Sequence, residues 1–286
     1  MTNAVAVAVL GAAYVSLFVL ERALPLRRSK ARLLSRLLVN VAISAAAFAA
    51  AVALVEPAAA TMLGVTQQAG LGLMRLAGLS GALEFAVTFL LLDLSFYYWH
   101  VANHRVPFLW RFHNVHHIDP DLDVSTAFRF HFVEVGFSAA FRAVQVLLIG
   151  PTLTAYMVYE VAFQLGTLFH HSNLRLPIPI ERALNMVLVT PRMHGIHHSD
   201  IRDENLTNFG VVLPWWDSLH RTLRLNVPQA EVTIGIPGYS RPADNRLLRA
   251  LLMPFGRQRD YWRGPQGRQM RRRPPFGAAN VRQLAA

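Results

Sequence analysis

The distribution of apolar residues predicts a helical membrane protein. Residues 4–20, 37–55 and 83–99 are almost continuously apolar, and each approaches the roughly 20 helical residues that cross a bilayer. Residues 132–169 form a longer apolar region, which Gly150 and Pro151 interrupt. Because glycine followed by proline favours a turn, this region is expected to form two helices. The pattern predicts an all-α integral membrane protein with four to five transmembrane helices.

The composition supports this class. Of the 286 residues, 53% are hydrophobic, and the mean hydropathy of +0.30 is too high for an ordinary soluble enzyme. The first apolar segment has no basic flank before it, so we expect a retained helix and not a cleaved signal peptide. The chain has no cysteine. This excludes disulfides, thiolate ligands and cysteine nucleophiles, so that any metal ion must be held by nitrogen and oxygen.

Basic residues are distributed unevenly between the apolar segments. Residues 21–36 contain six of them and residues 56–82 contain one, which places the first linker in the cytoplasm. When the chain is followed through its spans, all three dense histidine groups fall on that side, in a helical cap. Arg142 lies within an apolar segment, where it is expected to face the bundle interior or a glutamate such as Glu160.

The net charge of +11 is concentrated beside the apolar segments and in the C-terminal tail. This placement favours contact with anionic lipid headgroups, and no nucleic-acid partner is expected. Lysine occurs once, at Lys30, among 28 basic residues, which fits a GC-rich bacterial genome. We therefore expect a bacterial inner-membrane protein.

Eight of the twelve histidines fall into three tight groups. The groups are His100 and His104; His113, His116 and His117; and His194, His197 and His198. Residues three and four apart share one face of a helix, so each group can direct two or three imidazoles at one point. Imidazole is compatible with iron, zinc and copper, and eight neutral nitrogens exceed the four ligands of one tetrahedral zinc ion. The count favours a dinuclear metal centre.

Absent motifs narrow the chemistry. The chain has no H-E-x-x-H sequence, in which a glutamate would act as the general base of a zinc metalloprotease. It also lacks E-x-x-H, by which soluble di-iron bundles combine glutamate with histidine. An all-imidazole ligand shell remains. A G-x-G-x-x-G fingerprint for flavin or nicotinamide is absent as well, so electrons for a redox reaction must come from a separate donor.

The residues around the histidines resemble a known family. The order H-x3-H, H-x2-H-H, H-x2-H-H beside membrane helices is similar to the fatty acid hydroxylase and sterol desaturase superfamily of integral membrane oxygenases. The resemblance covers residues 83–225. Further matching segments are Asp93-x3-Tyr97-x2-His100, Arg111-Phe112-His113, Arg129-Phe130-His131-x2-Glu134, His171-Ser172-Asn173, Pro191-Arg192-x-His194, Asn208-Phe209-Gly210 and Trp216-Asp217.

The resemblance implies a centre of two non-haem iron ions, with the eight grouped histidines as ligands. His171 and His131 are further candidate ligands. The alternative for His171 is a polar cap where a helix leaves the membrane, and His131 could instead orient Glu134. Ligand imidazoles usually donate their second N–H to a carboxylate or carbonyl. The candidate carboxylates are Asp93, Glu134, Asp200, Asp203, Glu204 and Asp217. His170 and His220 match no family position.

The implied activity is hydroxylation or desaturation of a lipid with O2 as co-substrate, such as a fatty acyl or sterol-like substrate. A ferredoxin- or cytochrome-type donor would supply the electrons. The substrate would enter from the bilayer past aromatic side chains, although such residues are more often core or interfacial anchors. The candidates are Phe128, Phe130, Phe132, Phe163 and Phe169. A membrane zinc hydrolase and a non-catalytic membrane metal-binding protein of the same fold remain alternatives.

Three segments are expected along the chain. Residues 1–82 would form N-terminal transmembrane helices and the basic cytoplasmic linker, and residues 83–225 the catalytic domain. Residues 226–286 would contain a short interfacial helix and a basic, flexible tail that begins at Arg257. In the interfacial helix, Leu247, Leu248, Leu251 and Leu252 interleave with arginines, as is typical of a helix lying in the membrane surface.

Overall fold

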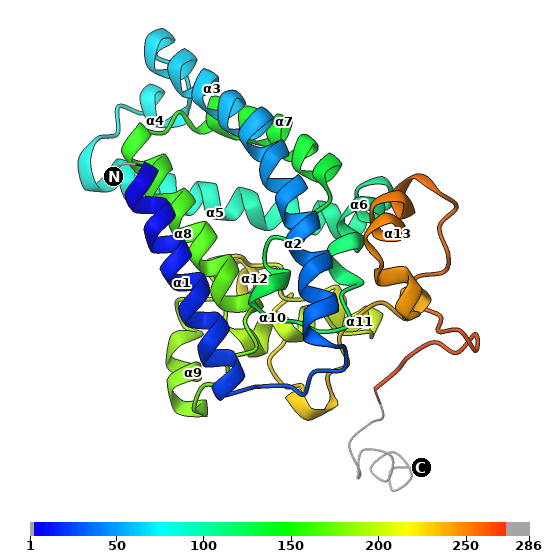
Figure 1. Ribbon diagram of the computed structural model, residues 1–286. Coiled ribbons are helices and arrows are strands. Elements are labelled where there is room, and N and C mark those ends of the chain that lie inside the picture. Colours follow the sequence, from blue (N-terminus) through cyan, green and yellow to red (C-terminus); the bar gives the residue numbers. More distant parts are fainter. Residues whose placement is uncertain (1–2, 273–286) are drawn as a thin grey trace, which may run out of the picture.

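The computed structural model describes residues 3–272, and this part of the chain is built from helices and loops. Figure 1 shows the long helices in the upper part of the view, from which the first two run down beside several short helices in the lower part. The helices are α1 (Asn3–Ala23), α2 (Leu33–Ala50), α3 (Glu56–Ala69), α4 (Leu73–Leu76), α5 (Gly81–Arg105), α6 (Pro107–His117), α7 (Phe132–Ile149), α8 (Leu153–His171), α9 (Ile178–Leu184), α10 (Pro191–His197), α11 (Arg202–Asn205), α12 (Trp215–Leu219) and α13 (Leu247–Leu252). The all-α prediction is confirmed.

Four helical segments are long and apolar enough to cross a membrane. They are Ala4–Ala23, Leu33–Leu76, Gly81–Arg105 and Phe132–Ile149. Large apolar side chains such as Val7 and Phe48 are exposed on them, which is the property of a surface that contacts lipid. The predicted class, a helical membrane protein with a histidine-rich cluster, is confirmed.

The connection between the second and third predicted spans differs from expectation. The sequence predicts a linker over residues 56–82, between the second and third spans. In the structure, α2 instead continues into α3 through a π-helical turn at Ala51–Val55. Pro57 lies in the first turn of α3 and has no N–H to donate. A π turn shifts the backbone hydrogen-bond pattern, so the helix continues past the proline. Helix α3 then packs along α7.

The predicted turn at Gly150 and Pro151 is confirmed. Gly150 adopts a left-handed conformation with φ 66° at the end of α7, and a Cβ there would lie 2.6 Å from the carbonyl oxygen of Leu71. Only glycine suits this backbone and this close approach. The Thr152 hydroxyl then caps α8 by accepting a hydrogen bond from the N–H of Ala155. The two helices are thereby joined by three residues.

Arg142 faces the bundle interior, as the sequence predicts. It forms an ion pair of 2.5 Å with Glu160, and its Nη1 donates to Gln145 at 2.8 Å. The guanidinium carbon lies 4.1 Å from the centre of the Phe96 ring. An arginine within an apolar bundle requires such partners, because an unpaired charge in hydrocarbon is costly.

A buried polar network joins the membrane helices to the histidine-rich cap. Arg36 at the start of α2 donates from Nε to Asp119 at 2.7 Å and from Nη1 to Asp123 at 2.7 Å. The Arg36 side chain is only 2% exposed. Part of the basic surplus that the sequence assigns to lipid headgroups is therefore internal. This network fixes the loop that follows α6 against α2.

The C-terminal region contacts the rest of the molecule further along the chain than expected. The sequence predicts a flexible tail from Arg257, but Arg259 pairs with Asp244, and Arg272 donates from Nη2 to Glu204 at 2.8 Å. Residues 273–286 lie outside the described residues. Leu248 and Leu252 on α13 are exposed, which is compatible with the predicted interfacial helix.

Candidate metal centre

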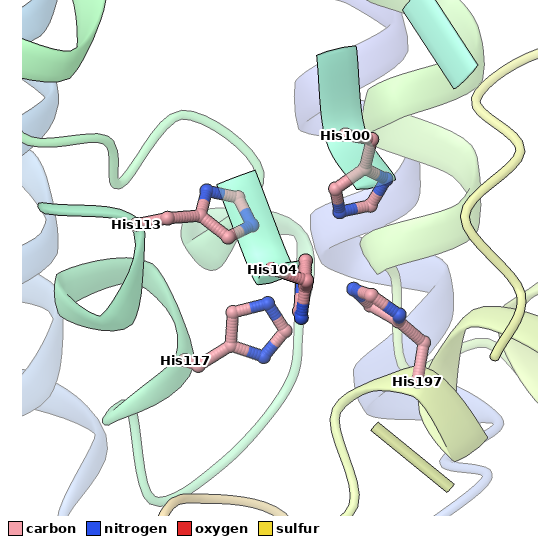
Figure 2. A group of neighbouring side chains, drawn as sticks. All are labelled: His100, His104, His113, His117 and His197. Carbon is pink, nitrogen blue, oxygen red and sulfur yellow. The ribbon is translucent and has the colours of Figure 1, made fainter. Parts of the chain in front are cut away.

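Nine histidines converge at the cap in two groups. The five-histidine group contains His100 and His104 from α5, His113 and His117 from α6, and His197 from α10. The four-histidine group contains His116, His171, His194 and His198. Within each group, one ring nitrogen of every member lies within 4.8 Å of those of the others. Figure 2 shows the rings of the five-histidine group around a common space.

Backbone carbonyls fix the ring orientation of two members of the five-histidine group. Nδ1 of His100 lies 2.8 Å from the carbonyl oxygen of Phe209, and Nδ1 of His197 lies 2.8 Å from that of Thr207. A carbonyl oxygen only accepts, so each Nδ1 carries the proton and each Nε2 of a neutral ring carries a lone pair. This is the tautomer that a metal ion requires.

His113 is oriented in the same way by a carboxylate. Its Nδ1 lies 2.7 Å from Oε1 of Glu134, in the first turn of α7, and both side chains are buried. Several Nε2 atoms of the group are buried with no hydrogen-bond partner among residues 3–272. They belong to His104, His113, His117 and His197. Buried polar atoms without partners are rare, and convergent imidazole nitrogens are the donor set of a transition metal. The residues therefore fit a metal ion.

The four-histidine group converges through its Nε2 atoms. His171 Nε2 lies 2.9 Å from His116 Nε2 and 3.1 Å from His194 Nε2, which in turn lies 3.1 Å from His198 Nε2. Nδ1 of His171 donates to the Thr167 carbonyl at 2.8 Å, so its Nε2 has no proton to donate to either neighbour. Two ligands about 2.1 Å from one ion, at right angles, would be about 3.0 Å apart. The spacing thus fits a metal ion better than a chain of hydrogen bonds.

Burial keeps the rings of the cap neutral. Desolvation, reinforced by the neighbouring imidazoles, lowers the pKa of His116, His194 and His198 well below the ordinary histidine value. Because a protonated imidazole cannot bind a metal ion, this shift favours the form that acts as a ligand at neutral pH.

His131 lies outside both groups. Its Nδ1 accepts from the N–H of Val133 at 3.1 Å and so caps α7, while its Nε2 donates to the carbonyl oxygen of Leu251 at 3.1 Å. Both ring nitrogens are in use, and neither is left for a metal ion. His131 therefore stabilises the start of the helix that carries Glu134, and the structure gives no support to the alternative of His131 as a ligand.

His170 was passed over in the sequence, yet it is buried beside the centre. Its ring centroid lies 4.1 Å from that of His194, and its Nδ1 lies 3.0 Å from the carbonyl oxygen of Val211. The adjacent His171 could have pointed to it, although consecutive residues on a helix face different directions. His170 packs behind His194 and supports its ring.

Asp93 does not pair with a ligand histidine, which corrects the expectation from the sequence. Its carboxylate accepts from the backbone N–H groups of Val212 and Leu213 at 3.3 and 3.1 Å, and from Nε1 of Trp216 at 2.8 Å. The hydroxyl of Tyr159 is a fourth donor at 3.4 Å. Asp93 therefore anchors the loop before α12, and it acts on the histidines only through that loop.

Asp217 anchors the same loop from its other end. Its carboxylate accepts from the N–H groups of Phe209 and Gly210 at 2.8 and 2.7 Å. A Cβ on Gly210 would lie 2.8 Å from the carbonyl oxygen of Leu213 and 2.9 Å from Asp217 itself, so only glycine fits there. The loop is held tightly where the Phe209 carbonyl accepts from His100.

Asp200 and Asp203 make no side-chain hydrogen bond to a histidine within residues 3–272. Burial raises the pKa of Asp200 to about 6, and the charge of Lys30 opposes that rise. Asp203 is exposed, and its carbonyl oxygen accepts from Arg224. Glu204 is bound to Arg272. Of the expected carboxylates, the structure brings only Glu134 to a ring of either group.

Asn205 is a buried residue that the sequence reasoning missed. Its Oδ1 lies 3.0 Å from Nδ1 of His104, and its Nδ2 donates to the carbonyl oxygen of His197 at 2.9 Å. The same Nδ2 lies 3.3 Å from Nδ1 of His117. One amide thus contacts three members of the five-histidine group, which come from three different helices.

Comparison with known proteins assigns this domain. The model of the fatty acid hydroxylase family matches residues 85–222, the part of the chain that carries all nine converging histidines. Residues 85–222 belong to the fatty acid hydroxylase family. No solved structure matches the chain.

Several curated relatives of this fatty acid hydroxylase domain are lipid-modifying enzymes by name. Ornithine lipid hydroxylase OlsE of Rhizobium tropici is 30% identical over 178 residues, which cover 62% of this chain and 52% of the relative. Human alkylglycerol monooxygenase is 31% identical, over 47% of this chain and 29% of the relative. Human cholesterol 25-hydroxylase is 30% identical, over 47% and 49%. The chain thus matches about half or less of these relatives.

A cleft of about 820 Å³ reaches one member of the five-histidine group, His104. His104 lines it, together with Trp110 from α6 and Trp262 from the C-terminal segment. The ring of Trp110 lies 4.8 Å from that of His104, and it stacks on Trp262 at 6.1 Å. The volume is that of an ordinary small-molecule site.

The phenylalanines expected along the substrate path do not line this cleft. Phe130, for example, stacks on His116 at a centroid distance of 4.6 Å, and Phe163 packs on Phe96 at 4.5 Å. These rings support the centre and the bundle. Aromatic residues alone could not locate the cleft from the sequence, because its two sides come from segments about 150 positions apart.

Proposed function

We propose that the chain is an O2-dependent di-iron lipid hydroxylase of a bacterial inner membrane, with its centre facing the cytoplasm. The observation that carries this proposal is the pair of buried groups of converging imidazoles, in one of which four Nε2 atoms have no partner among the described residues. The family and the names of the relatives favour lipid hydroxylation over other metal chemistry. Desaturation of a fatty acyl or sterol-like lipid is the related alternative.

Iron bound in these groups would supply the reduction of O2 and the oxidation of an unactivated C–H bond. In hydroxylation, one oxygen atom enters the lipid and the other leaves as water, which requires two electrons and two protons. The protein holds the rings by their Nδ1–H groups, through the Phe209 and Thr207 carbonyls and through Glu134. Because these partners are fixed before iron binds, ring reorganisation costs little.

The electrons are proposed to come from a separate ferredoxin- or cytochrome-type protein. Such carriers are commonly acidic, and exposed arginines of the cap, such as Arg221 and Arg257, would attract an acidic partner. The lipid reaches the centre laterally from the bilayer, which removes the need to extract it into water.

Lipid analysis of cells that express the protein tests the activity. Wild-type protein should produce an oxygenated lipid that carries the label of isotopic O2, and His197→Ala should not. Metal analysis of protein made without added zinc should find iron. A zinc hydrolase would contain zinc and would form its product in the absence of O2. If the protein were a non-catalytic metal-binding protein, cells with the wild type and cells with His197→Ala would have the same lipid profile.

The absence of native cysteine makes the orientation directly measurable. Ser240 is exposed beside the cap, and Ser80 is exposed at the opposite end of α5 from His100. In sealed inner-membrane vesicles, Ser240→Cys should react with a membrane-impermeant maleimide only from the cytoplasmic side, and Ser80→Cys only from the other. The reverse pattern would contradict the proposed orientation.

A further inference from the structure

The cleft beside His104 has a charged mouth that the hydroxylase activity does not by itself explain. Arg105, Arg111 and Arg202 line it, and no aspartate or glutamate does. None of the three arginines has an ion-pair partner among the described residues 3–272. Three unneutralised guanidinium groups around one concave surface attract an anion, and guanidinium matches the geometry of phosphate and carboxylate oxygens.

The chemistry of the walls changes with depth. Trp110 is buried against the ring of His104 and stacks on the half-buried Trp262, whereas Arg105 and Arg202 are exposed. The part of the cleft nearest His104 is therefore aromatic. At the α5–α6 turn, Val106 is 43% exposed and Phe108 is 54% exposed. Apolar side chains exposed beside arginines are typical of a surface at the level of lipid headgroups. The cleft thus combines an anion-attracting mouth with an apolar interior.

We propose that this cleft binds the substrate lipid by an anionic headgroup, a phosphate or a carboxylate, and directs its hydrocarbon towards His104. The inference rests on the proposed lipid hydroxylase function and adds the class of substrate to it. It separates this chain from an enzyme that acts on neutral lipids, since an alkylglycerol or a sterol offers no charge to Arg105, Arg111 and Arg202.

Two other occupants fit the cleft less well. Residues 273–286 of the chain itself contain Arg273 and Arg282 and no acidic residue, so they would bring like charge to the mouth. An acidic electron carrier could contact the arginines from outside, but a folded protein cannot enter about 820 Å³ and would leave the aromatic walls uncovered. A single anionic lipid molecule can contact the arginines at the mouth with its headgroup and cover the aromatic walls with its hydrocarbon.

Lipid retention by the full chain in an uncharged maltoside detergent tests the proposal without turnover. Phosphatidylglycerol and diacylglycerol with identical acyl chains are added in equal amounts, and bound lipid is counted by native mass spectrometry in the absence of reductant. The wild type should retain at least about tenfold more phosphatidylglycerol, since a charge-assisted contact contributes about 1.5–3 kcal/mol. The double variant Arg105→Gln/Arg202→Gln should lose about that factor.

Arg182→Gln is the matched control, because Arg182 is exposed on α9 and outside the cleft. It should retain phosphatidylglycerol like the wild type. Equal retention of diacylglycerol, or equal losses in the control and the double variant, would overturn the proposal. Full displacement by an equal concentration of inorganic phosphate would overturn the lipid assignment and indicate a free-anion site.

Two further measurements, the rate of reduction by an electron donor and the formation of product, separate the remaining explanations. A slower reduction by an acidic donor in the double variant, with lipid retention unchanged, would assign the arginines to the electron carrier and also overturn the proposal. Product formation is measured in parallel. Selective retention of phosphatidylglycerol without oxygenated product would refute the hydroxylase function and support the lipid-binding cleft. Oxygenated product without selective retention would support the hydroxylase function and refute the lipid-binding cleft.

Discussion

The carboxylate of Glu134 accepts a hydrogen bond from Nδ1 of His113 at 2.7 Å, and this contact joins a membrane-spanning helix to the five-histidine group. Both side chains are buried, so water cannot replace either partner. The bond fixes the ring of His113 and leaves its Nε2 directed at the group without a proton. Glu134 is in this way a positioning residue for the metal centre.

Glu134→Ala should therefore weaken metal binding. Loss of a partner of this kind typically lowers metal affinity about 10–100-fold. Glu134→Gln keeps an acceptor without the charge, so its metal affinity should fall less. The measurement is metal content after dialysis against buffered free iron. Glu231→Gln, at a side chain that is 56% exposed, is the control. An unaltered metal content in Glu134→Ala would contradict the assigned role.

Asn205→Ala should affect the five-histidine group selectively. It removes the acceptor of His104 and the donor to the His197 carbonyl, and each buried group left without a partner costs about 1–3 kcal/mol. We expect the bound metal to fall from two ions towards one. The neighbouring Asp203→Asn, at an exposed side chain, should retain two. Equal loss of metal from the two histidine groups would show that Asn205 stabilises the whole fold and not the five-histidine group in particular.

Helical geometry accounts for much of what the sequence could predict about the site. His113 and His117 are four residues apart and share the five-histidine group, while His194 and His198 share the four-histidine group. His116 lies three residues after His113, a spacing that also places two side chains on one helical face, yet it belongs to the other group. The expectation that each sequence group is directed at one point is therefore wrong, and the spacing alone could not divide the histidines between the two groups.

Contacts that depend on the tertiary fold could not be predicted. Asp93 is a candidate partner of a ligand histidine in the sequence, but its donors include the N–H groups of Val212 and Leu213, about 120 positions later. Asn205 lies in no histidine motif. It reaches the rings of His104 and His117 and the carbonyl oxygen of His197 only because α5, α6 and α10 meet there. The continuation of α2 into α3 differs from the expected end of the second apolar segment at residue 55.

Asp93→Ala should destabilise the protein and lower its metal content together. The variant leaves two backbone N–H groups and the Trp216 indole without an acceptor, at about 1–3 kcal/mol each. The loop they hold carries the Phe209 carbonyl that accepts from His100. Thermal unfolding in detergent and metal analysis check this. A destabilised variant with full metal content would show that the loop does not orient His100.

His171→Ala and His131→Ala should separate a ligand from a helix cap. His171 contributes an Nε2 to the four-histidine group, so its loss should remove metal and activity. His131 caps α7 and points away from both groups, so its loss should cost about 1 kcal/mol of stability and leave the metal content unchanged. Loss of metal from His131→Ala at a temperature where the variant is folded would restore it as a candidate ligand.

Asp123 should make the stability of the cap depend on pH in a defined direction. Burial alone would raise the pKa of its carboxyl, but hydrogen bonds and the charge of Arg36 outweigh burial and hold it below the ordinary value. A lowered folded-state pKa stabilises the fold above the unfolded-state value of about 3.9, and this stabilisation is lost as the pH falls through the folded-state pKa. Asp123→Asn should therefore cost about 3–5 kcal/mol at neutral pH, because it breaks a buried ion pair.

The difference in unfolding free energy between wild type and Asp123→Asn should narrow below about pH 4. Protonation of the cap histidines affects both proteins alike, so it cancels in that difference. Chemical unfolding in detergent at several pH values provides the measurement, and Asp203→Asn, at an exposed carboxyl, should show little difference at any pH. A gap that stays constant into the acidic range would mean that Asp123 holds the loop by shape and hydrogen bonding, and that its charge contributes nothing to the attachment of the cap to α2.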